Sequence, residues 1–137
     1  MITSAEEFVF LREHEDPESY RRAATEDAPE AVWEAVIETY PEMRFWVIHN
    51  KTVPLTILKR LARDSAVCIR AAVADKRKLD RELFDLLSKD VDESVRQRIA
   101  YNKKTPLDVL EQLSTDTSDL VASVAKDRLN GGHRGHP

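Results

Sequence analysis

The chain has 137 residues, of which 42% are hydrophobic, and a formal net charge of −4. These values predict a single globular domain and exclude wholesale disorder. One cysteine excludes an internal disulfide framework and a cysteine-cluster metal site within one chain, and no apolar run reaches the ~20 residues that cross a bilayer. We expect no cofactor and no membrane partner. The start of the chain lacks the pattern of a signal peptide, which predicts a cytoplasmic protein.

The charge is unevenly spread along the chain. Residues 1–42 hold twelve Asp/Glu against three Arg, a balance of −9, whereas residues 43–137 hold thirteen Asp/Glu against eighteen Lys/Arg, a balance of +5. Such asymmetry can provide an acidic end and a basic end for steering or for partner choice. It can equally be uneven decoration of a solvated surface, and the sequence leaves both interpretations open.

The first predicted unit covers about residues 4–27. Ser4 and Glu7 have the spacing of a capping box, in which each side chain binds the other residue's backbone amide. Phe8 and Leu11 then mark the apolar face of a helix, and Pro17 suits the first turn of a second one. The unit is irregular, as expected of a terminal repeat that presents a polar end to water.

The second unit, about residues 28–52, places Trp33 and Val36 in the columns that Leu58 and Leu61 occupy one unit later, at a spacing of 25 residues. A large aromatic residue at helical spacing is best explained as core. We therefore expect Trp33 to be buried.

Residues 53–125 repeat one pattern three times at a spacing of 26, which defines units at about 53–78, 79–104 and 105–129. Self-similarity at a period of about 20–50 residues is typical of stacked-repeat proteins. The matching positions are Val53-Pro54, Leu79-Asp80 and Thr105-Pro106; Leu58, Phe84 and Leu110; Leu61, Leu87 and Leu113; Asp64, Asp90 and Asp116; and Ile69, Val95 and Val121.

Each of these units predicts two helices. The first helices are expected at about 54–62, 80–88 and 106–114, with Thr105 as an N-cap before Pro106. Asp64, Asp90 and Asp116 are expected to cap the second helices, because a carboxylate there favours the positive end of the helix dipole. Neither helix could bury its apolar stripe alone, so neighbouring units must stack. The fold class is therefore all-α, and residues 130–137 are expected to form a disordered tail.

The repeated motif resembles the leucine-rich repeat variant, a family of the HEAT-like α-solenoids. The resemblance rests on residues 53–64, 69–74 and 102–113 and covers about residues 28–129, with a weaker echo at 4–27. It implies a right-handed superhelix of about five two-helix units, in which one helix of each pair is short. The type member carries an iron–sulfur cluster on several cysteines, and because this chain has only Cys68, that cofactor is not expected here.

A ladder of arginines, Arg44, Arg70 and Arg96, follows the same spacing. Stacked guanidiniums could bind phosphates along a groove. Because Asp64 and Asp90 recur in the same units, ion pairs of Asp64 with Arg70 and of Asp90 with Arg96 are favoured, within or between repeats. This interpretation makes Asp64, Arg70, Asp90 and Arg96 a structural ladder.

Basic residues recur at the unit junctions and predict a positive ridge along one edge. Such an edge could bind an acidic protein surface or nucleic acid, or could simply be solvated. A pI of about 5.6 and the lack of aromatics among the basic residues argue against nucleic acid. The residues of this basic edge are Lys51, Lys76, Arg77, Lys78, Lys103 and Lys104.

Phe45 and Trp46 stand in columns that hold small or polar residues in the other units. Aromatic residues beside Arg44 would suit a binding hot spot. Alternatively, they pack over the shortened turn at Tyr40–Pro41. Asn50 and Asn102, in one column, are best explained by turn or capping chemistry.

The sequence offers no catalytic constellation. It has no glycine-rich phosphate loop, no nucleophile elbow and no HExxH motif. We therefore predict that the protein is not an enzyme and that it is a protein–protein interaction module, an adaptor or an inhibitor- or immunity-like partner. The alternatives are a nucleic-acid-binding solenoid that uses the basic edge and a HEAT-like enzyme.

Overall fold

The computed structural model describes residues 1–131. Within them lie ten α-helices and one 3₁₀-helix, with no strand, so the predicted all-α class is confirmed. None of the helices in this part of the chain has the length and apolar character needed to span a membrane. The last helix ends at Leu129, and the rest of the predicted tail, from residue 132 on, lies outside the described residues.

The chain divides into two compact units, residues 1–61 (unit 1) and residues 62–137 (unit 2). The boundary falls inside the predicted repeat 53–78, between the two helices expected there.

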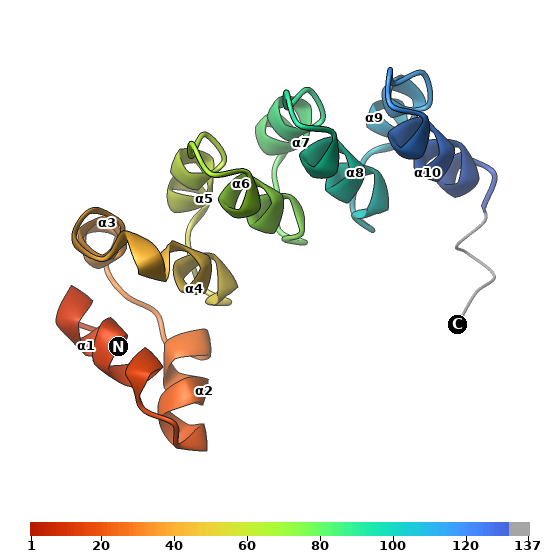
Figure 1. The fold of residues 1–137 in the computed structure, drawn as a ribbon. Coiled ribbons are helices and arrows are strands. Elements are labelled where there is room, and N and C mark those ends of the chain that lie inside the picture. Colours follow the sequence, from red (N-terminus) through yellow and green to blue (C-terminus); the bar gives the residue numbers. More distant parts are fainter. Residues whose placement is uncertain (132–137) are drawn as a thin grey trace. The chain divides into compact units, whose positions relative to one another are not determined.

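Unit 1 is built around α3, which contacts α1, α4 and α5, while α2 packs against α1 and α4 (Figure 1). Fully buried Phe8 and Trp33 form its centre, with ring centroids 5.2 Å apart in an edge-to-face arrangement. The burial predicted for Trp33 is thus confirmed. The elements are α1 (Ala5–Glu13), α2 (Pro17–Thr25), α3 (Glu30–Thr39), the 3₁₀-helix η1 (Pro41–Met43), α4 (Arg44–His49) and α5 (Leu55–Leu61).

Half of the predicted capping box at the start of α1 is present. The hydroxyl of Ser4 accepts a hydrogen bond from the Glu7 amide at 3.0 Å. The Glu7 carboxylate accepts from the amide of Thr3 at 2.8 Å. The chain before α1 is therefore held by a bond one residue earlier than a capping box would place it.

Unit 2 consists of two layers of helices. In Figure 1, α8 lies between α6 and α10, and it contacts both. The other layer contains α7, which packs on α6 and α8, and α9, which packs on α8 and α10. The elements are α6 (Val67–Ala74), α7 (Arg81–Leu87), α8 (Glu93–Tyr101), α9 (Leu107–Leu113) and α10 (Asp119–Leu129). The side chains that recur every 26 residues form its core: Ile69, Val95 and Val121, Phe84 and Leu110, and Leu87 and Leu113.

The predicted caps of the second helices are wrong by two residues. Asp90 accepts a hydrogen bond from the amide of Asp92 at 2.9 Å, and it is Asp92 that caps α8 by accepting from the amide of Ser94. Asp64 and Asp116 likewise accept from the amides two residues on, at 2.9 Å and 2.8 Å. These aspartates therefore close the turn before the helix, a common use of the short Asp side chain.

The predicted N-cap at Thr105 is also wrong. The cap of α9 is Pro106, which has no side chain that could accept a hydrogen bond. Thr105 is buried, and its hydroxyl donates to the carbonyl oxygen of Ile99 at 2.6 Å. A buried hydroxyl needs a partner, and here the end of α8 supplies it.

Candidate functional site

The arginine ladder is occupied by ion pairs within unit 2. Arg70 donates from Nε and NH2 to the two carboxylate oxygens of Asp90, at 2.8 Å and 3.1 Å. Its third nitrogen, NH1, donates to the carbonyl oxygen of Asp64 at 2.8 Å. The carboxylate that pairs with Arg70 is therefore Asp90, 20 residues further along the chain, and the predicted pairing with Asp64 is wrong. Asp64 binds Arg70 through its backbone carbonyl.

Arg96 repeats this arrangement 26 residues later. It donates to the two carboxylate oxygens of Asp116 at 2.9 Å and 3.1 Å, and to the carbonyl oxygen of Asp90 at 2.7 Å. The side chains of Arg70 and Arg96 are only 13% and 15% exposed. Because their donors already face carboxylates and carbonyls, neither arginine is placed to bind an external phosphate. Arg44, in unit 1, donates from Nε to the carbonyl oxygen of Pro41.

A buried asparagine joins neighbouring helix pairs in unit 2. The side-chain amide of Asn102 donates to the carbonyl oxygens of Ala74 and Lys76, both at 2.8 Å. Its oxygen accepts from the amide of Lys104 at 2.9 Å. Asn102 thereby satisfies backbone groups at the end of α6 and also fixes the turn that follows α8.

Residues at the same position of other predicted repeats as Asn102 make similar hydrogen bonds. In unit 1, Asn50 donates to the carbonyl oxygens of Ala23 and Glu26 at 2.8 Å and 2.9 Å. In unit 2, Arg128 donates to the carbonyl oxygens of Ala100 and Asn102 at 2.7 Å and 3.1 Å. Arg128 was not predicted from the sequence as a member of this set, although it follows Asn102 by the repeat spacing of 26 residues.

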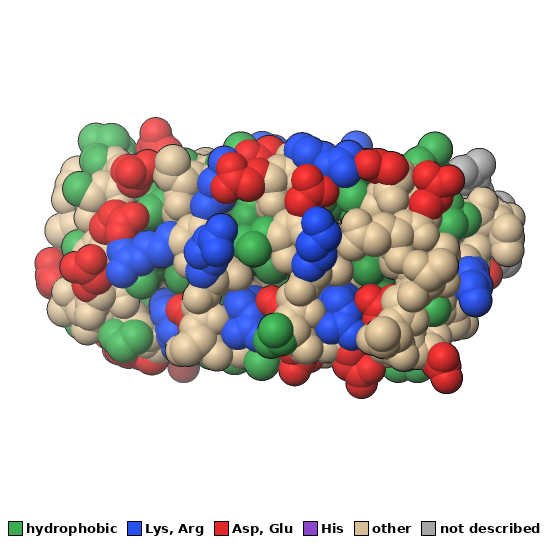
Figure 2. Space-filling model, turned by 90° about the horizontal axis from the view of Figure 1, so that it is seen from above, with side chains coloured by type: hydrophobic (Ala, Val, Ile, Leu, Met, Phe, Trp, Pro, Cys, Tyr) green, Lys and Arg blue, Asp and Glu red, His purple; other side chains and the backbone are tan. Residues whose placement is uncertain are grey.

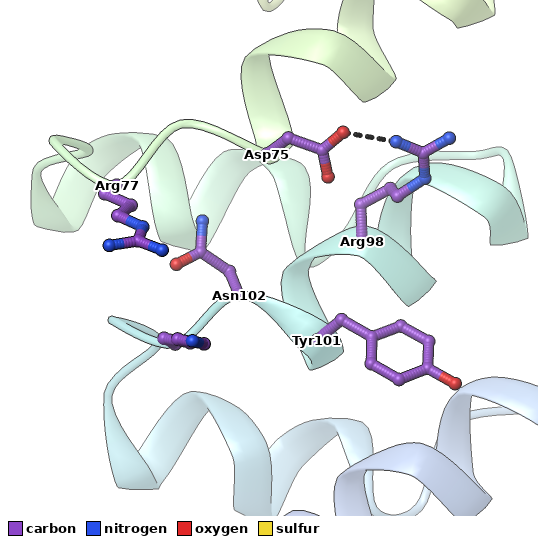
Figure 3. Close-up of a pocket in the computed structure, with 6 residues that line it drawn as sticks. Asp75, Arg77, Arg98, Tyr101 and Asn102 are labelled. Atoms are coloured by element: carbon purple, nitrogen blue, oxygen red, sulfur yellow. Dashed lines mark hydrogen bonds and ion pairs between the residues drawn. The ribbon is translucent and has the colours of Figure 1, made fainter. Parts of the chain in front are cut away.

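A pocket of about 220 Å³ opens in unit 2 where the turn after α6 meets the end of α8 (Figure 3). The guanidinium of Arg77 approaches Asn102 on one side of it. The ion pair of Asp75 and Arg98 lies on the other, and the ring of Tyr101 points away from Arg77. The residues that line the pocket are Asp75, Arg77, Arg98, Tyr101, Asn102 and Lys103.

The pocket is positively charged. Three cations and one carboxylate line it, and the carboxylate, Asp75, is paired with Arg98. Neither Arg77 nor Lys103 has a carboxylate partner among residues 1–131, and both are exposed. Two cationic side chains from different turns therefore meet at one cavity without an internal counter-ion.

The rest of the predicted basic edge lies as follows. Lys78 and Lys104 are exposed next to the two unpaired cations of the pocket. Lys76 is half-buried, and burial, together with the charge of Lys78, lowers the pKa of its ammonium group. Lys51 belongs to unit 1, where its backbone amide donates to the carbonyl oxygen of Ala24.

The pocket residues Asp75, Arg98 and Tyr101 were not predicted from the sequence, because the matching positions of the neighbouring units do not carry similar side chains.

Phe45 and Trp46 lie in unit 1 beside other aromatic side chains. Phe45 is 46% exposed, and its ring meets that of Trp46 edge-on at 5.1 Å. The guanidinium of Arg12 lies 3.5 Å from the centroid of the Trp46 ring. The cation over the Trp46 ring thus comes from α1, a contact that sequence spacing could not reveal.

Basic and acidic side chains are interspersed over the face of the molecule that Figure 2 shows. Comparisons with protein-family models, with curated proteins and with solved structures found no match for this chain.

Proposed function

We propose that the chain is a non-catalytic, cytoplasmic protein-interaction module, and that the pocket of unit 2 binds an acidic segment of a partner protein. The observation that carries this proposal is the contrast among the cations of unit 2. Arg70 and Arg96 are held by carboxylates, whereas Arg77 and Lys103 line a cavity whose one carboxylate, Asp75, is paired with Arg98. Cations without internal partners are available to an external anion.

The chemistry of the pocket suits a carboxylate. Arg77 can bind it with two parallel hydrogen bonds, and the Lys103 ammonium adds a compact charge. Tyr101, which is 49% exposed, offers a ring against the stem of an Asp or Glu side chain. The volume of about 220 Å³ is below the ~300–1,000 Å³ of pockets for drug-sized ligands, so a side chain of a peptide fits better than a small-molecule substrate.

We further propose that the helix pairs are units of a HEAT-like, right-handed α-solenoid of about five repeats. Supporting this, the bonds of Arg70 recur at Arg96, and the column of Asn102 recurs at Arg128, each after 26 residues. Contacts that repeat with the sequence period are typical of stacked repeats. Such stacking would hold Arg77 and Lys103, which come from successive turns, at a fixed distance.

Nucleic-acid binding is the second candidate, and Tyr101 is the observation that favours it. The exposed ring lies in the same pocket as Arg77 and Lys103, and an aromatic ring among cations can stack on a base. The net charge of −4 and the carboxylates among the basic side chains favour an acidic protein segment instead.

The proposal is tested by fluorescence anisotropy with a labelled peptide of about 12 residues rich in Asp and Glu, compared with single-stranded and duplex DNA of similar charge, each at low and high salt. The double variant Arg77→Ala/Lys103→Ala should bind the peptide about tenfold more weakly or worse. The matched control is Lys89→Ala/Lys126→Ala, which removes the same charge from exposed lysines outside the pocket. This control should bind like the wild type.

Equal loss in both double variants would show a general charge effect and would overturn the pocket. Stronger binding of DNA than of the peptide, with a steep loss at high salt and dependence on Tyr101, would move the assignment to nucleic acid. Circular dichroism of each variant, unchanged from the wild type, ensures that lost binding is not lost folding.

A further inference from the structure

We infer that unit 1 carries a second binding surface, formed by aromatic side chains, for a basic segment of a protein partner. The surface consists of the rings of Tyr20, Phe45, Trp46 and His49 with the guanidinium of Arg12, and we call it the aromatic surface. It goes beyond the proposed function, because it lies in the other unit, uses different chemistry and selects the opposite charge.

The rings of the aromatic surface contact one another. The rings of Phe45 and His49 are nearly parallel, with centroids 6.4 Å apart, and Trp46 meets both edge-on, at 5.1 Å and 5.5 Å. The Tyr20 hydroxyl lies 3.3 Å from Nε2 of His49. Side chains from α2 and α4 thus form one continuous layer of rings.

The fold does not require these rings. The centre of unit 1 is made by Phe8 and Trp33, whereas Tyr20 and Phe45 are each 46% exposed. In the columns of Phe45 and Trp46, the next two units carry Ala71 with Ala72 and Gln97 with Arg98, and their helices form nonetheless. Exposed aromatic rings that packing does not need are typical of binding surfaces.

Arg12 holds the layer in place. Its guanidinium lies 3.5 Å from the centroid of the Trp46 ring and 5.0 Å from that of Tyr20. Its Nε is buried and has no hydrogen-bond partner among the described residues, so the ring faces are what stabilise this part of the cation. Because Trp46 is fixed in this way before binding, a partner would lose little side-chain freedom on docking.

Acidic residues that neighbour the aromatic surface in the sequence favour a basic partner. Glu13 follows Arg12 directly, and Glu42 precedes Phe45 by three residues; both are exposed and have no basic partner among residues 1–131. Both charges also act on Tyr40. The pKa of Tyr40 is raised by its hydrogen bond to Glu6, by burial and by the charges of Glu6, Glu42 and Glu13. Residues 1–42 as a whole carry a balance of −9.

The occupant that fits is a protein segment with Lys or Arg next to an apolar side chain. Its cation would lie over the exposed face of Phe45, where a cation–π contact contributes ~0.5–2 kcal/mol. Glu13 and Glu42 would add long-range attraction and discriminate against acidic segments. The apolar side chain would cover the remaining ring surface of Tyr20.

Two labelled peptides of about 12 residues, one of Lys and Leu and one of Glu and Leu in the same amphipathic pattern, serve as probes. We expect the Lys/Leu peptide to bind, at least tenfold more tightly than the Glu/Leu peptide. Phe45→Ala should weaken this binding about tenfold, and Leu107→Ala, which removes an exposed apolar side chain in unit 2, should leave it unchanged. The variant Glu13→Lys/Glu42→Lys should lose most of the selectivity for the basic peptide.

Failure of this inference is distinguishable from failure of the proposed function, because Arg77→Ala/Lys103→Ala must leave Lys/Leu binding unchanged. Equal affinity for the two peptides, or full affinity in Phe45→Ala, would overturn the inference. Sedimentation velocity tests the other possible occupant, a second copy of the chain. A dimer of the wild type that dissociates in Phe45→Ala would assign the aromatic surface to a second copy of the chain and would overturn its assignment to a basic partner.

Discussion

Arg70 and Asp90 are joined by two parallel hydrogen bonds, although 20 residues and helix α7 separate them in the sequence. The aspartate is 7% exposed, and the arginine also reaches the backbone of Asp64. One side chain thus connects the turn before α6 with the turn before α8. Arg96 and Asp116 repeat the contact, so two such ion pairs connect successive turns of unit 2.

Arg96→Ala should lower the free energy of unfolding by about 2–4 kcal/mol, because the nearly buried carboxylate of Asp116 would lose its counter-ion. Urea denaturation measures this. The control is Arg81→Ala, whose ion pair with Asp108 joins side chains that are 54% and 60% exposed. An exposed pair contributes ~0–1 kcal/mol, so a loss from Arg81→Ala as large as that from Arg96→Ala would contradict this account.

Asn102→Ala should cost about 2–3 kcal/mol, since the carbonyl oxygens of Ala74 and Lys76 would lose their donor in a buried site. Asn102→Asp keeps the shape but removes the donors and introduces a negative charge, so it should be at least as destabilising. Ser123→Ala, at an exposed position of α10, serves as the control. Thermal unfolding monitored at 222 nm compares the three variants.

The indole nitrogen of Trp33 is buried without a hydrogen-bond partner among the described residues. Trp33→Phe removes this unsatisfied group and keeps an aromatic ring against Phe8, so it should change stability by no more than about 1 kcal/mol. Trp33→Ala leaves a large cavity and should cost about 3–5 kcal/mol. Equal losses in the two variants would contradict this expectation, because they would show that the indole N–H contributes to stability.

Stability should fall in acid partly through Glu26. The hydrogen bond from Arg22, with a further contribution from the amino group of Met1, lowers the pKa of Glu26 from 4.5 to about 2. A carboxyl whose pKa is lower in the folded state stabilises the fold above its unfolded pKa, and this stability is lost as the pH falls from about 4.5 towards 2.

Glu26→Gln should therefore remove about 1–2 kcal/mol of the stability at neutral pH, less than the full shift because the side chain is 25% exposed. The variant should also flatten the pH dependence between about pH 4.5 and 2. Glu111→Gln, at an exposed position of α9, is the control. Identical pH profiles for Glu26→Gln and the wild type would contradict the prediction.

Local patterns in the sequence predicted the helices well. The bounds of α5, α7 and α9 lie within one residue of those expected, because the apolar residues of each helix recur at helical spacing. Burial of Trp33 and of Leu87 followed from the same columns. Contacts between helices could not be predicted with this accuracy. In the sequence, Arg70 lies closer to Asp64 than to Asp90. Only the packing of α6 on α8 brings Asp90 within reach of Arg70.

The candidate sites show the same limit. Arg77 and Lys103 belong to the predicted basic edge, but the cavity between them depends on Asp75 and Tyr101, which follow no repeated pattern. Phe45 and Trp46 were candidates from the sequence, either as a binding hot spot or as packing over the turn at Tyr40–Pro41. Tyr20, another ring of the aromatic surface, comes from another helix, and no periodicity links it to them.

The most direct test of the central claim, that the pocket of unit 2 receives an acidic protein segment, is chemical-shift mapping with the Asp/Glu peptide on isotopically labelled protein. We expect the largest backbone amide shifts at residues 75–78 and 98–104, and their loss in Arg77→Ala/Lys103→Ala with the remaining spectrum intact. Shifts that are absent, that are spread over all basic residues, or that persist in the double variant would contradict the claim.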